Sequence, residues 1–191
     1  MSISLEQLLE SRDARCRHQK ELLASHPGDT LICLTVQFPG PQKRCAASLV
    51  VGGAGLAALL DKFGSVAHFT QVRDLETGYE AYLLVPLPAM LVKRLCCEIE
   101  DTHPLGRLMD IDVMETGHLL DRASIGLPPR RCLLCDNEVR YCMRAKTHSQ
   151  AELLAKIEQM VSSYCESEKI VLHLYCDSLT GGTGSIGKPV G

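Results

Sequence analysis

The spacing of apolar and polar residues divides this chain into short strands and amphipathic helices. A near-continuous apolar run over 30–38 predicts a strand that is buried on both faces. The runs 66–73 and 79–85 predict a hairpin with Gly78 in its turn. Residues 108–113 alternate between apolar and polar with a period of two, which is typical of a strand with one buried face.

Helical spacing of the apolar residues predicts four helices around these strands. The predicted helices cover 4–24, 45–63, 88–100 and 149–164. The first and last of them begin at Ser4 and Ser149, each followed three residues later by a glutamine or glutamate, which is the capping-box pattern. Three glycines between 52 and 55 favour close packing of the second helix, because the chain lacks both the dinucleotide-binding and the P-loop patterns.

The order of these elements is strand, helix, strand, strand, helix, strand. This order predicts an α+β fold with a ferredoxin-like split βαβ sheet, preceded by an N-terminal helix and followed by a Cys/His loop and a helix. A nucleotidyltransferase-like mixed sheet is the alternative. We expect one domain over 1–164. Beyond it, 165–191 would contain an edge strand at 169–175 and a flexible, glycine-rich tail.

Composition narrows the possible partners and the location. The chain has 191 residues and a net charge of −3, and only 4% of its residues are aromatic, with no tryptophan. We therefore expect neither a nucleic-acid partner nor a base-stacking surface. Without an apolar run long enough for a membrane span, and without a secretory signal, the expected location is the cytoplasm. The ten cysteines are then better interpreted as thiols or metal ligands than as disulfides.

Two carboxylates fall on one side of the strand predicted at 108–113. Asp110 and Asp112 alternate with three apolar residues that would bury the opposite side. Two like charges this close repel one another unless a cation lies between them, and a hard divalent ion such as Mg²⁺ suits carboxylate oxygens. Enzymes that transfer phosphates hold Mg²⁺ in this way. The alternative is that both aspartates simply face water.

Groups that suit phosphate chemistry surround this strand in the sequence. Glu100 and His103 lie upstream and could supply a general base or a further ligand, and Gly106 permits a tight turn before Arg107. Arg12 and Arg15 are spaced so that both could meet one anion. Lys43 follows a rigid Pro-Gly-Pro turn. A solvated helix face and a plain surface turn are the respective alternatives for these cations.

Three cysteines and one histidine follow within a short segment. They are Cys132, Cys135, Cys142 and His148, and the first pair has the spacing of a zinc knuckle. Three thiolates and an imidazole suit a tetrahedral, structural Zn²⁺ at the start of the last helix. The alternative is a set of reduced cysteines in the core.

Four stretches of the chain resemble the holo-citrate lyase synthase family, the apo-citrate lyase phosphoribosyl-dephospho-CoA transferases. They are Ser11-Arg12-Asp13-x-Arg15, Pro39-Gly40-Pro41-x-Lys43, the block from His103 to Val113, and Leu127-Pro128-Pro129-Arg130-Arg131-Cys132-Leu133-Leu134-Cys135 continuing to Cys142 and His148. The block His-Pro-Leu-Gly-Arg-x-x-Asp-Ile-Asp-Val is the most specific of the four.

The resemblance implies a nucleotidyltransferase that modifies an acyl carrier protein. A serine of the citrate lyase carrier subunit would attack the α-phosphate of 2′-(5″-triphosphoribosyl)-3′-dephospho-CoA, and pyrophosphate would leave. Asp110 and Asp112 would hold Mg²⁺, and Glu100 or His103 would take the serine proton. The implied phosphate ligands are Arg12, Arg15, Lys43, Arg107, Arg130 and Arg131. Alternatives are a nucleotidyltransferase acting on another carrier or a small molecule, and a non-catalytic zinc-binding adaptor.

Overall fold

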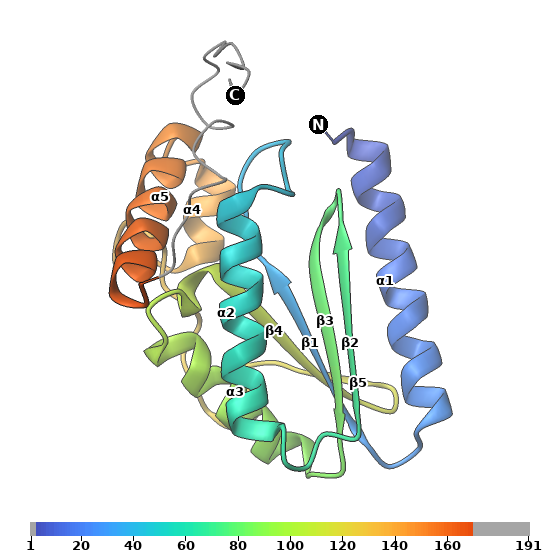
Figure 1. Cartoon of the computed structure of the whole chain (residues 1–191). Helices are drawn as coiled ribbons and strands as arrows, with labels where there is room; N and C mark the ends of the chain where they lie inside the picture. Colours follow the sequence, from blue (N-terminus) through green and yellow to red (C-terminus); the bar gives the residue numbers. More distant parts are fainter. Residues whose placement is uncertain (1–2, 170–191) are drawn as a thin grey trace, which may run out of the picture.

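A five-stranded antiparallel sheet separates one helix on its first face from the other long helices on its second (Figure 1). The computed structural model describes residues 3–169. The strands are β1 (Thr30–Val36), β2 (Phe69–Leu75), β3 (Gly78–Val85), β4 (Met109–Glu115) and β5 (His118–Leu120), in the order β2-β3-β1-β4-β5. The helices are α1 (Leu5–Ser25), α2 (Ala46–Phe63), α3 (Ala89–Thr102), α4 (Val139–Ala145) and α5 (Gln150–Ser167). The predicted α+β class is confirmed.

The two faces of the sheet bury separate hydrophobic cores. The larger core lies between the sheet and α2, α3 and α5, and includes Ile32 and Leu34 of β1. The smaller core lies under α1, where Leu22 packs against Leu31 and Tyr82. Because β1 pairs with β3 on one side and β4 on the other, its apolar run serves both cores. The prediction of a central first strand is therefore confirmed.

Glycines let α2 approach the sheet closely. A Cβ atom at Gly52 would lie 2.5 Å from the ring of Tyr79, and one at Gly55 would lie 2.9 Å from the side chain of Leu34. Neither position has room for a larger residue without a shift of its neighbour. At Gly53 a Cβ would meet nothing within 4 Å, so the predicted close packing holds for two of the three glycines.

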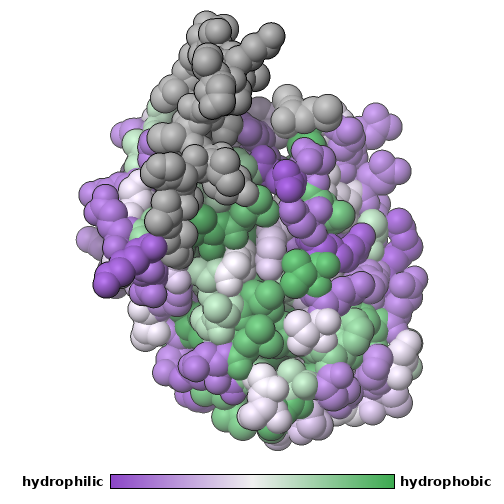
Figure 2. Space-filling view, in the orientation of Figure 1, coloured by the Kyte–Doolittle hydropathy of each residue, from purple (hydrophilic) through white to green (hydrophobic). Residues whose placement is uncertain are grey.

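The apolar character of α2 has a second consequence. Within residues 3–169, α2 is the one helix long and apolar enough to cross a membrane. The sequence pattern predicted no such helix. It packs against the sheet and buries Val51, Leu59 and Phe63 completely. Apolar residues gather down the middle of the face shown in Figure 2, where α2 runs. Leu60 of α2 remains 40% exposed. Core helices that pack against a sheet commonly have this composition.

The capping boxes form as predicted, whereas two short elements were not predicted. Ser4 caps α1 and Ser149 caps α5, each with a reciprocal bond from the third helical residue. Sequence patterns left β5 and α4 as loop, because three and seven residues carry little periodicity. β2 begins at Phe69 rather than at 66, since the chain after α2 first forms a turn on the carbonyl of Phe63. The edge strand and tail expected beyond residue 169 lie outside the described residues, and α5 itself continues to Ser167.

Candidate active site

The two aspartates of β4 project from the sheet face that carries α1. In the register of the sheet, Asp110 lies beside Thr35 and Asp112 beside Cys33 of β1. The intervening Ile111 is buried in the core on the opposite face. The alternation predicted from the sequence is therefore confirmed, and it places both carboxylates side by side on one surface.

Asp110 and Asp112 have different surroundings. Asp110 accepts a hydrogen bond from Nε2 of Gln37 at 2.8 Å and lies 3.5 Å from Nη1 of Arg130. The carboxylate of Asp112 makes no hydrogen bond or ion pair with any other residue in the described range 3–169. Burial, together with the charge of Asp110, raises the pKa of the Asp112 carboxyl above its usual range. A half-buried carboxylate without a partner, beside a second carboxylate, fits a site for a divalent cation.

A pocket of about 300 Å³ opens beside these aspartates at the edge of β4. Its walls come from α3, β4, β5, the segment 121–130 and the start of α4. Its charged lining residues are Lys93, Glu100, Asp110, Asp112, Asp121, Arg122, Arg130, Glu138 and Arg140. The pocket therefore combines carboxylates with four cations, which suits a phosphate-bearing ligand together with a metal ion.

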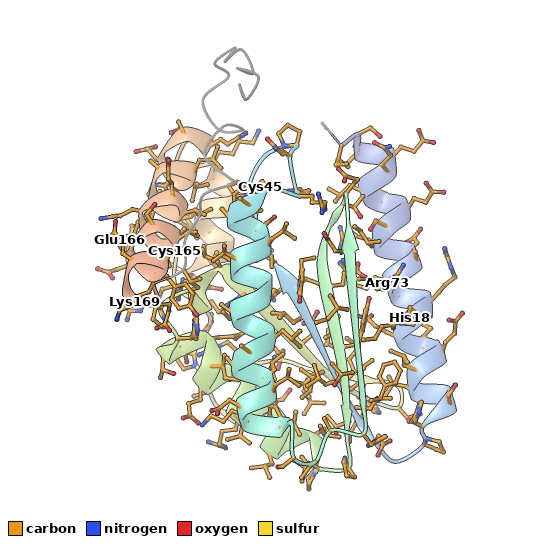
Figure 3. All side chains as sticks on the ribbon, in the orientation of Figure 1. His18, Cys45, Arg73, Cys165, Glu166 and Lys169 are labelled. Atoms are coloured by element: carbon orange, nitrogen blue, oxygen red, sulfur yellow. The ribbon has the colours of Figure 1, made fainter. Side chains whose placement is uncertain are left out.

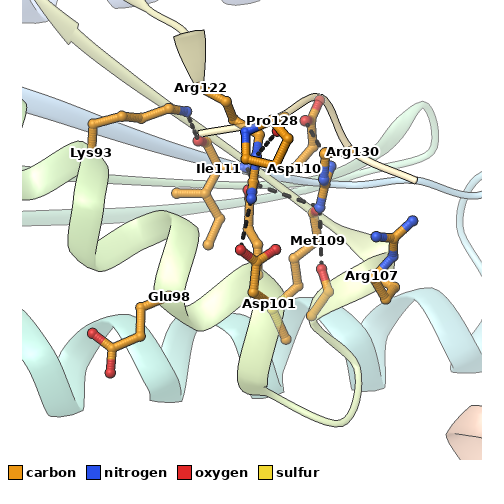
Figure 4. A network of polar contacts seen from close by, with 12 residues as sticks. Lys93, Glu98, Asp101, Arg107, Met109, Asp110, Ile111, Arg122, Pro128 and Arg130 are labelled. Carbon is orange, nitrogen blue, oxygen red and sulfur yellow. Dashed lines mark hydrogen bonds and ion pairs between the residues drawn. The ribbon is translucent and has the colours of Figure 1, made fainter. Parts of the chain in front are cut away.

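Two residues of α3 bind the open edge of β4 at Ile111. Figure 4 shows the contact from Lys93. The N–H of Ile111 donates to Oε1 of Glu100 at 2.9 Å, and its carbonyl accepts from Nζ of Lys93 at 3.0 Å. This edge is free because β5 pairs with β4 only from Val113 onward. Burial raises the pKa of Glu100, while the positive charge of Arg130 opposes the shift. Glu100 thus closes a strand edge and also faces the pocket.

Arg130 belongs to the site, whereas Arg131 points away from it. The guanidinium of Arg130 donates to the carbonyl of Met109 at 2.6 Å, and it lies 3.6 Å from Glu100. The Arg131 side chain is 69% exposed, and its ion pair within the described chain is with Asp136, at 3.5 Å. The carbonyl of Arg131 accepts from Arg107, which therefore supports this loop.

A second polar cluster joins α1 to the same face of the sheet. Buried Glu80 of β3 binds Nη1 of Arg15 at 3.2 Å, Nη1 of Arg73 at 3.5 Å and the hydroxyl of Tyr82 at 2.5 Å. Figure 3 shows Arg73 in the space between the sheet and α1. Thr35 of β1 lies between Glu80 and Asp110 in the register of the sheet, so the cluster and the aspartates share one face. The charge of Arg15 lowers the pKa of Asp112, against the larger effect of burial. Arg12 is exposed and makes no ion pair within the described chain.

Lys43 and His103 are bound elsewhere in the fold. Nζ of Lys43 donates to the carbonyl of Phe38 at 2.6 Å, which stabilises the loop after β1. Nδ1 of His103 accepts from the N–H of Leu105 at 3.0 Å, and its ring packs against Tyr164 of α5 with the centroids 5.4 Å apart. Neither residue lines the pocket that contains the aspartates.

Sequence reasoning missed seven polar or charged residues of the site. They are Gln37, Glu80, Lys93, Asp121, Arg122, Glu138 and Arg140. Glu80 lies within an otherwise apolar strand, and Lys93 lies seven residues before Glu100 on the buried face of α3. A charged residue at a buried position was the available signal in both cases. Gln37 and Arg122 lie outside regular elements and gave no such signal.

The four residues of the predicted zinc site come together. The ligand atoms of Cys132, Cys135, Cys142 and His148 all lie within 4.8 Å of one another. Sγ of Cys135 is 3.5 Å from Sγ of Cys142 and 3.3 Å from Nε2 of His148. Burial opposes ionisation of Cys132, but nearby backbone N–H groups and thiols lower the pKa of its thiol to about 7. This group could hold a metal ion, and three thiols with one imidazole suit tetrahedral coordination.

Comparison with known proteins identifies the family. The model of the apo-citrate lyase phosphoribosyl-dephospho-CoA transferase family matches residues 3–164. A probable apo-citrate lyase phosphoribosyl-dephospho-CoA transferase of Vibrio cholerae (serotype O1, strain M66-2) is 42% identical over 169 residues, covering 86% of this chain and 94% of that protein. The corresponding transferase of Escherichia coli O9:H4 (strain HS) is 38% identical over 165 residues, covering 84% and 90%.

A longer relative shows the same similarity over part of its length. Protein CitXG of Haemophilus influenzae is 36% identical over 177 residues, covering 91% of this chain and 38% of that protein. The family match spans α1 to α5 and includes the aspartates of β4 and the Cys/His cluster. The chain therefore belongs to the apo-citrate lyase phosphoribosyl-dephospho-CoA transferase family.

Proposed function

We propose that this protein transfers the phosphoribosyl-dephospho-CoA group from 2′-(5″-triphosphoribosyl)-3′-dephospho-CoA to a serine of the citrate lyase acyl carrier protein subunit. The observation that carries this proposal is the placement of Asp110 and Asp112 in one pocket with Arg130, in a chain of this family. A triphosphate with its metal ion requires carboxylates and guanidinium groups together, and this pocket supplies both.

Asp110 and Asp112 would hold Mg²⁺, because Asp112 has no protein partner in the described chain and one oxygen of Asp110 is bound only by neutral Gln37. When bound, Mg²⁺ would neutralise charge on the triphosphate and on the departing pyrophosphate. Gln37 and Arg130 fix the orientation of Asp110 from two sides. Preorganised carboxylates of this kind need little rearrangement when the substrate arrives.

Arg130 and Arg15 are the proposed phosphate ligands with the strongest structural support. Arg130 lines the pocket, and Glu80 holds Arg15 on the sheet face that carries the aspartates. A guanidinium presents a planar fork of N–H donors that matches phosphate oxygens. We propose that Arg107 acts indirectly, by holding the backbone of Arg131. Arg12, Lys43 and Arg131 have less structural support as phosphate ligands, because none of them lines the pocket.

The serine hydroxyl would attack the α-phosphorus and form a phosphodiester. The bond from the α-phosphorus to the oxygen that bridges to the β-phosphorus would break, and pyrophosphate would leave with that electron pair. The serine proton needs an acceptor. Of the two candidates, we favour Glu100 over His103, because Glu100 lines the pocket and burial raises its pKa.

We further propose that the Cys/His cluster binds a structural Zn²⁺ and that the strands and helices from β1 to β4 form a ferredoxin-like unit. Four protein ligands would leave no open coordination position, so the ion would order the segment 131–148 rather than act on the substrate. The strand order β2-β3-β1-β4, with α2 and α3 on one face of the sheet, supports the proposed unit. In this arrangement β5 extends the sheet beyond β4.

Mass spectrometry of the carrier subunit tests the function directly. The protein is incubated with unmodified citrate lyase carrier, the triphosphoribosyl donor and Mg²⁺. We expect the carrier to gain the mass of one phosphoribosyl-dephospho-CoA group, with release of one pyrophosphate. A carrier with the acceptor serine changed to alanine should stay unmodified. An unchanged mass of the wild-type carrier at high enzyme concentration would reject the proposal.

A further inference from the structure

The short helix α4 carries unpaired cations and exposed apolar side chains on one face. Arg140, Arg144 and the following Lys146 are exposed, and none of their side chains makes a hydrogen bond or ion pair within residues 3–169. Tyr141 is 61% exposed and Met143 is 71% exposed. Between 139 and 146 the sequence contains no carboxylate. We name Arg140, Tyr141, Met143 and Arg144 the α4 patch.

Helical geometry explains why these four side chains share a surface. Cys142 is the buried residue of α4, and its thiol belongs to the Cys/His cluster. With 3.6 residues per turn, Arg140 and Arg144 lie one above the other on the side away from Cys142. Met143 and Tyr141 flank them on the two sides. The cluster of cysteines and histidine thus holds α4 with its cations and apolar side chains facing outward.

The α4 patch is continuous with the pocket that contains the aspartates. Glu138 and Arg140 line that pocket, and they also line a surface depression of about 590 Å³ with Tyr141 and Arg144. A serine side chain is only one carbon long. The surface of an acceptor protein around its serine must therefore touch the rim of the pocket when the hydroxyl reaches the aspartates. α4 forms part of this rim.

We propose that the α4 patch is the docking surface for the acceptor protein, and that it receives an acidic face of that protein beside the acceptor serine. The identity of this partner, the citrate lyase carrier subunit, rests on the proposed function. Cations without internal partners lose no ion pair on binding, and opposite charges on the two surfaces speed association and fix orientation. Exposed Tyr141 and Met143, which flank the two arginines, would supply apolar contacts in such an interface.

Steady-state kinetics with the carrier and the donor varied separately test this proposal. The variant is Arg144→Glu, because Arg144 does not line the aspartate pocket. We expect the KM for the carrier to rise about tenfold or more, since like charges across an interface repel. The KM for the donor and kcat at saturating carrier should stay unchanged. Arg94→Glu is the matched control, because Arg94 is an exposed helical arginine without an ion pair in the described chain.

Calorimetric binding of a carrier whose acceptor serine is changed to alanine separates docking from chemistry. The wild type should bind this carrier more tightly than Arg144→Glu does, and added salt should reduce the difference. If the wild type modifies the carrier but Arg144→Glu behaves as wild type, the docking proposal alone fails. A raised KM for the donor, or a wild-type dimer that Arg144→Glu dissociates, would assign the patch to the donor or to a second copy instead. If the wild type neither modifies nor binds the carrier, the proposed function fails as well.

Discussion

Lys93 and Glu100 bind the two backbone polar groups of a single residue of β4. Nζ of Lys93 donates to the carbonyl of Ile111, and Oε1 of Glu100 accepts from its N–H. Ile111 lies between the two aspartates, so this clamp fixes the strand at the point where both carboxylates leave it. Because Lys93 and Glu100 are two turns apart on one side of α3, a single helix provides both contacts.

Glu100→Gln tests whether Glu100 also accepts the serine proton. Glutamine retains an oxygen for the N–H of Ile111, so we expect a folded protein. If Glu100 is the base, kcat should fall by about a hundredfold or more. The wild-type kcat should decrease as the pH falls through the raised pKa of Glu100, because only the ionised carboxylate can take a proton. A near-normal kcat of Glu100→Gln at saturating Mg²⁺ would contradict the assignment.

Asp110→Asn and Asp112→Asn should both reduce transfer at saturating Mg²⁺ by at least about a hundredfold, the scale of losing one preorganised electrostatic group. Their stabilities should differ. Asp112 has a raised pKa and no partner in the described chain, so Asp112→Asn should raise the Tm of the metal-free protein. Asp110→Asn breaks the ion pair with Arg130, so this variant should not raise the Tm. Near-normal transfer by either variant would reject the metal assignment.

Arg130→Lys and Arg131→Lys should behave differently, although the two arginines are adjacent. Lysine at 130 cannot reach Asp110 and the carbonyl of Met109 together, because it lacks the planar fork. We expect the KM for the donor to rise at least about tenfold in Arg130→Lys. Arg131→Lys serves as the matched control, because that side chain is largely exposed. Equal kinetics for the two lysine variants would show that Arg130 does not bind the donor.

Arg15→Lys should weaken donor binding more than Arg12→Lys does. Glu80 holds Arg15 beside the aspartate face, whereas Arg12 is exposed and has no ion pair in the described chain. Lysine would keep the charge at 15 but lose the rigid guanidinium. The two variants are compared by their KM for the donor, measured at saturating carrier. A larger effect at Arg12 would show that the donor lies further along α1.

Metal analysis tests the Cys/His cluster. Protein purified without a chelator should contain about one zinc per chain, and Cys135→Ser should contain almost none. Loss of the ion should lower the Tm, because the ligands connect the segment after Arg131 to α4 and to the start of α5. Cys16→Ser is a suitable control, since Cys16 is an exposed thiol on α1. A zinc-free wild type whose Tm is unaffected by chelators would show that these cysteines and the histidine do not form a structural zinc site.

Local patterns were enough to predict much of the framework. The alternation over 108–113 placed Asp110 and Asp112 on one face, and β4 confirms it. The capping boxes located the starts of α1 and α5, because their hydrogen bonds join residues only three apart. The spacing of the Cys/His cluster also predicted a group that the structure brings together. Each of these features depends on neighbours along the chain, so the sequence by itself determined them.

Only the tertiary structure decided which polar side chains meet. The adjacent Arg130 and Arg131 look equivalent in the sequence, but one faces Asp110 and the other faces solvent. Lys93 reaches Ile111 only because α3 packs beside the unpaired edge of β4. Likewise, β5 forms because that edge offers free N–H and carbonyl groups for pairing. A segment of three residues does not form a strand without such a partner. Contacts between residues distant in the chain depend on how the layers pack, and no local pattern encodes that packing.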